Sequence, residues 1–360
     1  YEINNFDYKK RKYSLNQFLP VIGLNPDDGF RIGFVDNFTT YGLQRNPFTT
    51  RHSISASYYT GNSGYDFSYN GEFSNIFHNW NFGVEGKYTS PNFAQNFFGF
   101  GNETEYDKNE VDIDFNRVSI KEWRAAISLI WRGRDGGSFY FKPLVESFEV
   151  ENVADRFIND IPADASLFKK QTYLGGELNY SFKNKDNPAY PTMGLDVGIT
   201  AGYKAAVDGN EENAFGYIEP HIALAHRLNK SASLVLATKL GGTAIIGDNF
   251  ELYHAAQLGG GHSLRGFRKE RFTGQYAVHQ NTELRLRLGK FKTGVIPLRY
   301  GITGGFDYGR VWVKDDTSDK WHNSVGGSFW VSGLELFTAN IGYYGSSDGG
   351  QIAFVLGFAL

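Results

Sequence analysis

One stretch decides the fold: residues 65–74 read YDFSYNGEFS. Aromatic residues and a glycine alternate there with polar residues, which is the period of two of a β-strand with one apolar and one polar face. The same period recurs at residues 80–89, 173–182, 277–288 and 352–360. The sequence therefore predicts an all-β protein.

This alternation is shared by soluble sandwiches and membrane barrels. Many of the runs reach about 10 residues, the length that a tilted strand needs to cross a bilayer, whereas soluble strands average about 5 or 6. Aromatic residues also gather at the ends of the runs, as in the interfacial girdles of membrane barrels: Tyr58, Tyr59, Phe77, Trp80, Trp131, Phe139, Tyr140, Trp312, Tyr343 and Tyr344. We predict a membrane barrel, with a soluble all-β protein as the alternative.

The composition of the 360 residues excludes several other classes. Aromatic residues make up 16% of the chain and glycine contributes 43 residues, a composition typical of strands and turns. No run of about 18 apolar residues is present to form a membrane-spanning helix. The absence of cysteine excludes disulfides and thiolate chemistry. A net charge of −3 gives no attraction for nucleic acid.

Turn residues divide the chain into sixteen expected antiparallel strands. They lie at residues 28–40, 49–60, 64–75, 79–90, 111–121, 122–133, 137–150, 171–183, 193–204, 215–228, 232–246, 275–289, 297–313, 322–332, 334–345 and 350–360. The division at Lys121 stays open, because no turn residue lies near it and residues 115–132 could form one strand.

Short and long connections are expected to alternate, as turns and loops do in outer-membrane barrels. Residues 61–64 and 133–137 are among the short connections, and residues 151–170 and 248–274 are among the long ones. The long segment 91–110 is an exception, because it falls where a short turn is expected.

Residues 1–27 show no such alternation and are predicted to be a linker toward a periplasmic or passenger domain, with residues 28–360 as the barrel. The basic residues 9–12 are either a solvated tail or a contact with anionic lipid. The chain begins at Tyr1 with no Met and no signal-peptide pattern, so we expect that a signal peptide or a longer N-terminal part has been removed or is not present here.

The stretch LGGGHSLRGF at residues 258–267 precedes the twelfth expected strand. Its glycines allow a tight fold that could enter a barrel lumen and present the guanidinium of Arg265. A buried arginine needs a carboxylate partner to offset its desolvation. Glu283 and Asp307 are expected to face inward on the next two strands, and glycines beside Asp307 leave room for the loop.

These motifs resemble the BamA/TamA/FhaC superfamily of outer-membrane barrels. LRGF at 264–267 is similar to the tip of its sixth extracellular loop, FDYGRVW at 306–312 to its wall motif, and NTELR at 281–285 to the strand between them. Residues 27–33 and 191–194 extend the likeness, which covers the chain from about residue 27.

The resemblance implies a 16-stranded barrel whose sixth loop is folded inward and locked. The implied lock and wall residues are Arg265, Gly266, Phe267, Asp307, Glu283, Phe306 and Gly309. The salt bridge of Arg265 could serve only to hold the plug loop in place, and this interpretation is as good as a gating role. Gly33 in the first expected strand and Gly357 in the last would weaken a lateral seam, or would only relieve the curvature of the barrel.

Two features depart from the family. Its barrels usually end on an aromatic residue, whereas here Phe358 is followed by Ala359 and Leu360. The linker and barrel also use all 360 residues and leave no room for periplasmic POTRA repeats. The segment 92–104 is similar to barrels that follow a metallophosphoesterase-like or patatin-like enzyme domain.

The resemblance implies an outer-membrane protein of a Gram-negative bacterium that anchors, and translocates or inserts, a polypeptide. The implied partners are outer-membrane lipid and lipopolysaccharide, a polypeptide substrate or passenger, and periplasmic or lipoprotein partners. A passive porin and a membrane anchor for an N-terminal enzyme are the alternatives. The eight histidines and the lumen carboxylates form no metal or catalytic motif, so we expect neither cofactor nor enzymatic activity in the barrel.

Overall fold

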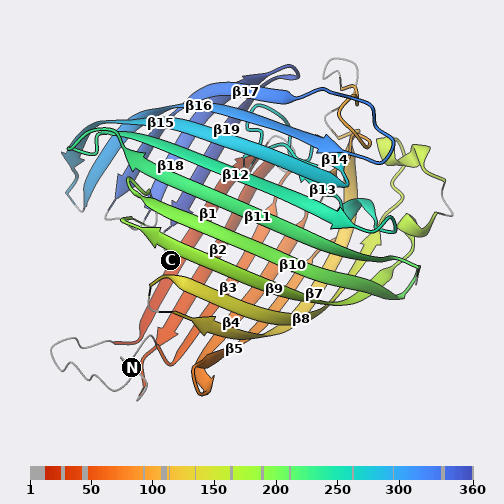
Figure 1. Cartoon of the computed structure of the whole chain (residues 1–360), viewed down its shortest axis with the longest axis horizontal. Coiled ribbons are helices and arrows are strands. Elements are labelled where there is room, and N and C mark those ends of the chain that lie inside the picture. The colour runs from red at the N-terminus through yellow and green to blue at the C-terminus, as the bar shows by residue number, and fades with distance from the viewer. Residues whose placement is uncertain are drawn as a thin grey trace.

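The computed structural model describes thirteen stretches of the chain (Figure 1). They are residues 13–25, 29–42, 48–91, 94–106, 112, 114–133, 135–162, 165–187, 190–210, 212–261, 263–294, 296–333 and 337–358. Within these residues the structure is all-β apart from short 3-10 turns. No helix in this part of the chain is long and apolar enough to span a bilayer.

Sixteen long strands form the wall of a barrel, as predicted. They are β1 (Leu15–Asn25), β2 (Gly29–Thr40), β3 (Thr50–Tyr59), β4 (Tyr65–Phe77), β5 (Trp80–Thr89), β7 (Arg117–Arg132), β8 (Gly137–Val150), β9 (Gln171–Lys185), β10 (Gly194–Asp208), β11 (Ala214–Arg227), β12 (Leu234–Ile246), β15 (Tyr276–Lys292), β16 (Pro297–Trp312), β17 (His322–Gly333), β18 (Phe337–Ser346) and β19 (Gly349–Phe358). Each pairs antiparallel with the next along the chain.

Three short strands lie outside the wall. The strand β6 (Ala94–Asn96) pairs with the start of β7, and β13 (Ala256–Leu258) pairs with β14 (Phe272–Gly274). The pair β13–β14 forms the base of the loop that carries Arg265.

Two strand predictions are wrong in a way that leaves the count unchanged. Residues 111–121 and 122–133, predicted as two strands, contribute to the single strand β7, because no turn residue interrupts them. The missing strand is β1, which lies inside the predicted linker 1–27. The alternation of β1 is hard to recognise in its sequence, because Pro20 and Gly23 interrupt a short apolar run. Proline lacks an N–H and is tolerated on an edge strand, which is where β1 lies.

The union of the two predicted strands into β7 changes which connections share an end of the barrel. The described residues of the connections after β5, β8 and β12 all lie at one end, here called the loop end, so the long segment that fell among the turns is no exception. Contacts such as the N–H of Asn96 to Oε2 of Glu270 (2.8 Å) hold these loops together. The short connection 60–64 also lies at this end, contrary to expectation. The opposite end, here called the turn end, carries the turns 133–136 and 186–193.

The two faces of the wall differ as the alternation predicts. Exposed apolar side chains occupy every second position, for example Leu236 and Leu240 on β12 and Leu284 and Leu286 on β15. Charged residues such as Glu283 and Arg285 take the positions between them and line the inside. An apolar outer surface around a polar lumen is the arrangement expected of a barrel in a bilayer.

The sheet has a seam between its first and last strands. In the described residues no register joins β1 to β19, although the two strands lie next to each other. Gly33 was predicted to lie at this seam, but it lies on β2, between Val21 of β1 and Ser57 of β3, because β1 precedes it. Gly357 lies on the last strand, opposite Thr338 of β18. Ala359 and Leu360 lie outside the described residues.

Candidate functional site: the loop that carries Arg265

The loop after β13 folds back toward the wall through glycines in the left-handed backbone region. Gly259 and Gly260 have φ values of 126° and 77°, which side chains other than glycine rarely adopt. At the tip, a Cβ on Gly266 would lie 2.6 Å from Cβ of Ser324 and 2.8 Å from the carbonyl oxygen of Gly345. Glycine at 266 therefore lets the tip lie directly against β17 and β18.

Arg265 is held to the wall by both its backbone and its side chain. Its N–H donates to Oδ2 of Asp307 (2.9 Å), and its Nη2 donates to Oδ1 of the same carboxylate (2.6 Å). Its Nη1 donates to Oε1 of Glu283, and its guanidinium lies 4.2 Å from the ring centre of Tyr344. A bidentate, charge-assisted contact of this kind fixes direction as well as position.

Asp307 is fully buried, so water cannot stabilise its charge. Asn281 Nδ2 and Ser324 Oγ also donate to it, at 2.7 and 2.8 Å. Burial by itself would lower the pKa of Arg265, but Asp307 and Glu283 raise it above its usual value. The arginine therefore stays charged, and removal of either partner would leave a buried charge uncompensated.

The remaining predicted residues divide into two groups. Phe267 is buried and packs on Phe272 and His322, with ring centres 5.1 and 5.8 Å away. Gly309 adjoins the loop, since a Cβ there would lie 3.2 Å from Cδ1 of Leu258. Phe306 points outward and is 44% exposed, so it does not contact the loop.

Sequence analysis missed a second segment at the site, the turn 186–193 from the turn end. The ring of Tyr190 lies 4.5 Å from that of Trp330 on β17, and its hydroxyl is 3.3 Å from Oγ1 of Thr303 on β16. Arg285 lies over the Tyr190 ring at 4.5 Å and donates to the carbonyl oxygen of Pro191 (3.4 Å). Nothing in the residues 191–194 indicated that this turn bends toward strands far along the sheet.

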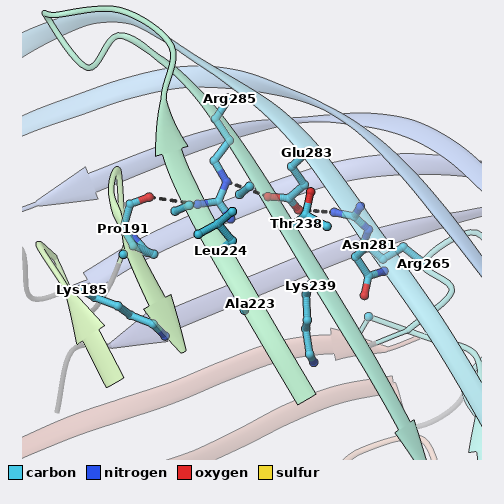
Figure 2. A pocket seen from close by; sticks show the side chains of 14 residues that line it. Lys185, Pro191, Ala223, Leu224, Thr238, Lys239, Arg265, Asn281, Glu283 and Arg285 are labelled. Atoms are coloured by element: carbon cyan, nitrogen blue, oxygen red, sulfur yellow. Dashed lines mark hydrogen bonds and ion pairs between the residues drawn. The ribbon is translucent and has the colours of Figure 1, made fainter. Parts of the chain in front are cut away.

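The loop and the turn meet through one carboxylate. Nε of Arg285 donates to Oε2 of Glu283 (2.7 Å), while Arg265 binds the other oxygen. Figure 2 shows Pro191, Arg285, Glu283 and Arg265 in a row along one side of a cavity of about 310 Å³. The lumen is therefore crossed by a continuous chain of contacts from one end of the barrel to the other.

A model of the Omp85 superfamily domain matches residues 63–359. The chain belongs to the Omp85 superfamily. This confirms the resemblance found in the motifs around Arg265 and Asp307. No curated protein in the comparison matches the sequence.

Solved structures similar to this Omp85 chain include BamA from Haemophilus ducreyi lacking POTRA domains 1–3. The identity is 14% and the TM-score 0.67, over 97% of this chain and 70% of that one. CdiB from Escherichia coli has 11% identity and a TM-score of 0.61, over 96% of this chain and 62% of its own. CdiB from Acinetobacter baumannii has 14% identity and a TM-score of 0.58, over 97% of this chain and 60% of its own.

A further group of residues anchors the loop of this Omp85 barrel at the loop end. Nε of Arg271 donates to Oδ2 of Asp348 (2.5 Å), and its Nη1 donates to Oγ1 of Thr104 (2.6 Å). Glu270 accepts from the N–H of Asn96 (2.8 Å). Segment 94–106 thus holds the charged stretch that follows the tip, and the density of charge at residues 268–271 was the only sequence signal for it.

Proposed function

We propose that this Omp85 barrel inserts or translocates a polypeptide in the outer membrane of a Gram-negative bacterium. The observation that carries the proposal is the seam, where, among the described residues, β1 and β19 share no register while every other neighbouring pair of wall strands does. An unpaired edge in a bilayer is costly unless another strand can occupy it. A seam of this kind is a place where a polypeptide could pair with the barrel.

The contacts inside the lumen favour a path at the seam over a permanently open pore. Arg265 and Tyr190 each bring a loop or turn across the interior, and both are tied to the wall. A passive porin would need an open channel, so this observation favours transport over diffusion. In this proposal the loop end faces outward, lipid and lipopolysaccharide surround the apolar outer face, and periplasmic or lipoprotein partners meet the turn end.

A disulfide across the seam tests the proposal, since the chain contains no other cysteine. Cysteines at Ile22 or Phe18 of β1 are combined with cysteines at Ile352 or Phe354 of β19, and the pair that cross-links is used. The control pair joins Ile32 and Tyr58, register partners on β2 and β3. The cargo is an unfolded copy of this barrel, added to liposomes that contain the folded protein, and the readout is its rate of insertion.

We expect insertion to be roughly tenfold faster than into empty liposomes, to stop when the seam is cross-linked and to return with reductant. A polypeptide fused before Tyr1 gives the second readout, its protection from protease after reconstitution. The proposal is overturned if neither cargo responds to the protein. Equal activity of the seam-locked and control-locked proteins would exclude the seam as the path.

A further inference from the structure

The lumen has an imbalance of charge in its turn-end half. Two cavities of about 310 and 460 Å³ lie there, and a narrow crevice opens beside Tyr190. The cavities are neighbours, because Lys185 of β9 lines the first and Lys183 lines the second. These three spaces are here called the lower lumen.

The carboxylates that line the lower lumen are all paired in the described structure. Glu72 accepts two hydrogen bonds from Arg132, the shorter 2.6 Å long. Glu85 accepts from Nζ of Lys142 at 3.0 Å. Glu283 is shared by Arg265 and Arg285, so these three carboxylates have little negative charge left to offer.

Five cations that line the same spaces have no carboxylate within 4.0 Å in the described residues. They are Arg51, Lys183, Lys239, Arg287 and Arg299, here called the lumen cations. Arg51 lies over the Phe48 ring at 4.4 Å, and Arg287 donates to the carbonyl oxygen of Ser231 at 2.7 Å, so both contact neutral groups. Glu219 also lacks an ion pair there, but it lies near the middle of the wall, opposite Thr200, and lines none of these spaces.

Glu72 attracts Arg51, and Asp196 attracts Lys183 and Lys239, from beyond 4.0 Å, but these carboxylates are already paired with Arg132 and Lys185. Cations without a carboxylate in contact, inside a low-dielectric wall, focus a positive potential and concentrate anions. The lumen cations are spread over β3, β9, β12, β15 and β16. Neighbouring strands are about 4.8 Å apart, so β9 and β16, five strands apart, are separated by roughly 24 Å of wall. One small anion therefore cannot contact more than one or two of the lumen cations, whereas a chain with several carboxylates can.

We propose that the lower lumen binds an acidic, extended segment of a polypeptide. A membrane lipid is the weaker candidate for the same charges, because lipid approaches the outer face, where the same strands present Leu240, Leu284 and Leu286. The rings of Tyr190 and Trp330 stand beside Arg287 and Arg299 in the crevice and supply apolar contact for such a segment. This inference rests on the proposed function, because it names the class of cargo that the barrel would receive at its turn end.

The test measures binding of a fluorescent peptide of alternating Glu and Gly to the detergent-solubilised barrel by fluorescence anisotropy. The same peptide with Lys in place of Glu is the charge control. The lumen variant carries Arg51→Gln, Lys183→Gln, Lys239→Gln, Arg287→Gln and Arg299→Gln. The matched variant loses the same charge from the loop end through Lys121→Gln, Lys169→Gln, Lys170→Gln, Lys314→Gln and Lys320→Gln.

We expect the natural barrel to bind the acidic peptide and not the basic one, with affinity falling roughly tenfold between about 50 mM and about 500 mM salt. The lumen variant should bind roughly tenfold more weakly, and the matched variant should bind like the natural barrel. Heat-modifiable migration checks that each variant is folded. If the fivefold variant does not fold, Lys239→Gln and Arg299→Gln are tested singly and should each weaken binding.

Equal loss of binding in the lumen and matched variants would overturn the inference. So would displacement of the peptide by an equal concentration of inorganic phosphate, or by vesicles of anionic phospholipid, since either would indicate a site for small anions or lipid. The assay requires no transport. A barrel that binds the peptide but moves no cargo overturns only the proposed function, and one that transports cargo but binds no acidic peptide overturns only this inference.

Discussion

Arg265 and Arg285 share one carboxylate, Glu283, although they serve opposite ends of the barrel. Arg265 arrives from the loop end on the tip of a long connection, and Arg285 belongs to the wall and reaches down to Pro191 in the turn. A change at either arginine therefore alters the charge that holds the other. The loop and the turn are expected to respond together when the lumen opens.

Loss of the Asp307 carboxylate should release the loop. Asp307→Ala leaves Arg265 largely buried with Glu283 as its remaining partner, and breaking a buried pair costs about 3–5 kcal/mol. We expect faster cleavage of the loop by trypsin at Arg265 and a higher conductance in planar bilayers. Asp319→Ala, at a fully exposed loop-end carboxylate, is the control and should change neither. An unchanged cleavage rate in Asp307→Ala would contradict the lock.

Two glycines of the same loop should respond differently to alanine. Gly266→Ala places a Cβ against Ser324 and Gly345 at less than van der Waals distance, so docking of the tip should weaken by about 1–3 kcal/mol. Gly261→Ala meets no atom within 4 Å and should be tolerated. Hydrogen exchange of the tip amides measures both, and equal protection in the two variants would show that close packing at Gly266 is unimportant.

Tyr190 should hold the turn inside the lumen chiefly through its ring. Tyr190→Phe removes the hydroxyl contact with Thr303, a loss of about 1 kcal/mol, whereas Tyr190→Ala also removes the contacts with Trp330 and Arg285. We expect conductance to rise slightly in the first variant and more in the second. Tyr203→Ala, at an exposed outward position, is the control. A larger effect of Tyr190→Phe than of Tyr190→Ala would refute this order.

The loop end should lose stability in mild acid because of His254. This histidine is buried among Phe148, Tyr173 and Phe215, and its Nε2 lies 3.0 Å from Oε1 of Glu146. Burial, aided by Lys204, lowers the pKa of His254 to about 4.

Because the free imidazole has a pKa of about 6.5, the unfolded chain binds the proton more readily than the folded chain. Stability should therefore be complete above about pH 6.5 and fall by up to about 3 kcal/mol as the pH drops toward 4. Proteolysis of residues 151–170 at several pH values measures the effect. His254→Gln should flatten the dependence, and His226→Gln, at an exposed position, should not. A rise in stability toward pH 4 would contradict the assignment.

Much of the site could be predicted because its signals are local. Arg265 and Gly266 lie in a glycine-rich stretch with one cation, and Asp307 lies between glycines on an otherwise regular strand. Asn281 pairs in register with Asp307, so an inward carboxylate and its amide donor follow from strand alternation alone. Phe306 was included only because it belongs to the motif, and the same alternation turns it outward.

The alternation of the sequence by itself determined an all-β chain with an apolar outer face, because the side-chain period of a strand is local. The predicted count of sixteen strands was right only because one strand too many at residues 111–133 offset the missed strand Leu15–Asn25. Tertiary structure alone decided which segments form the sixteen strands. Leu15–Asn25 is a strand because β2 offers an edge with which it can pair, although Pro20 breaks its own alternation. Tertiary structure alone also brought Tyr190 to Trp330, since that contact joins positions far apart in the chain. Such contacts depend on how a turn bends inside the barrel, and the spacing of residues along the chain does not indicate that bend.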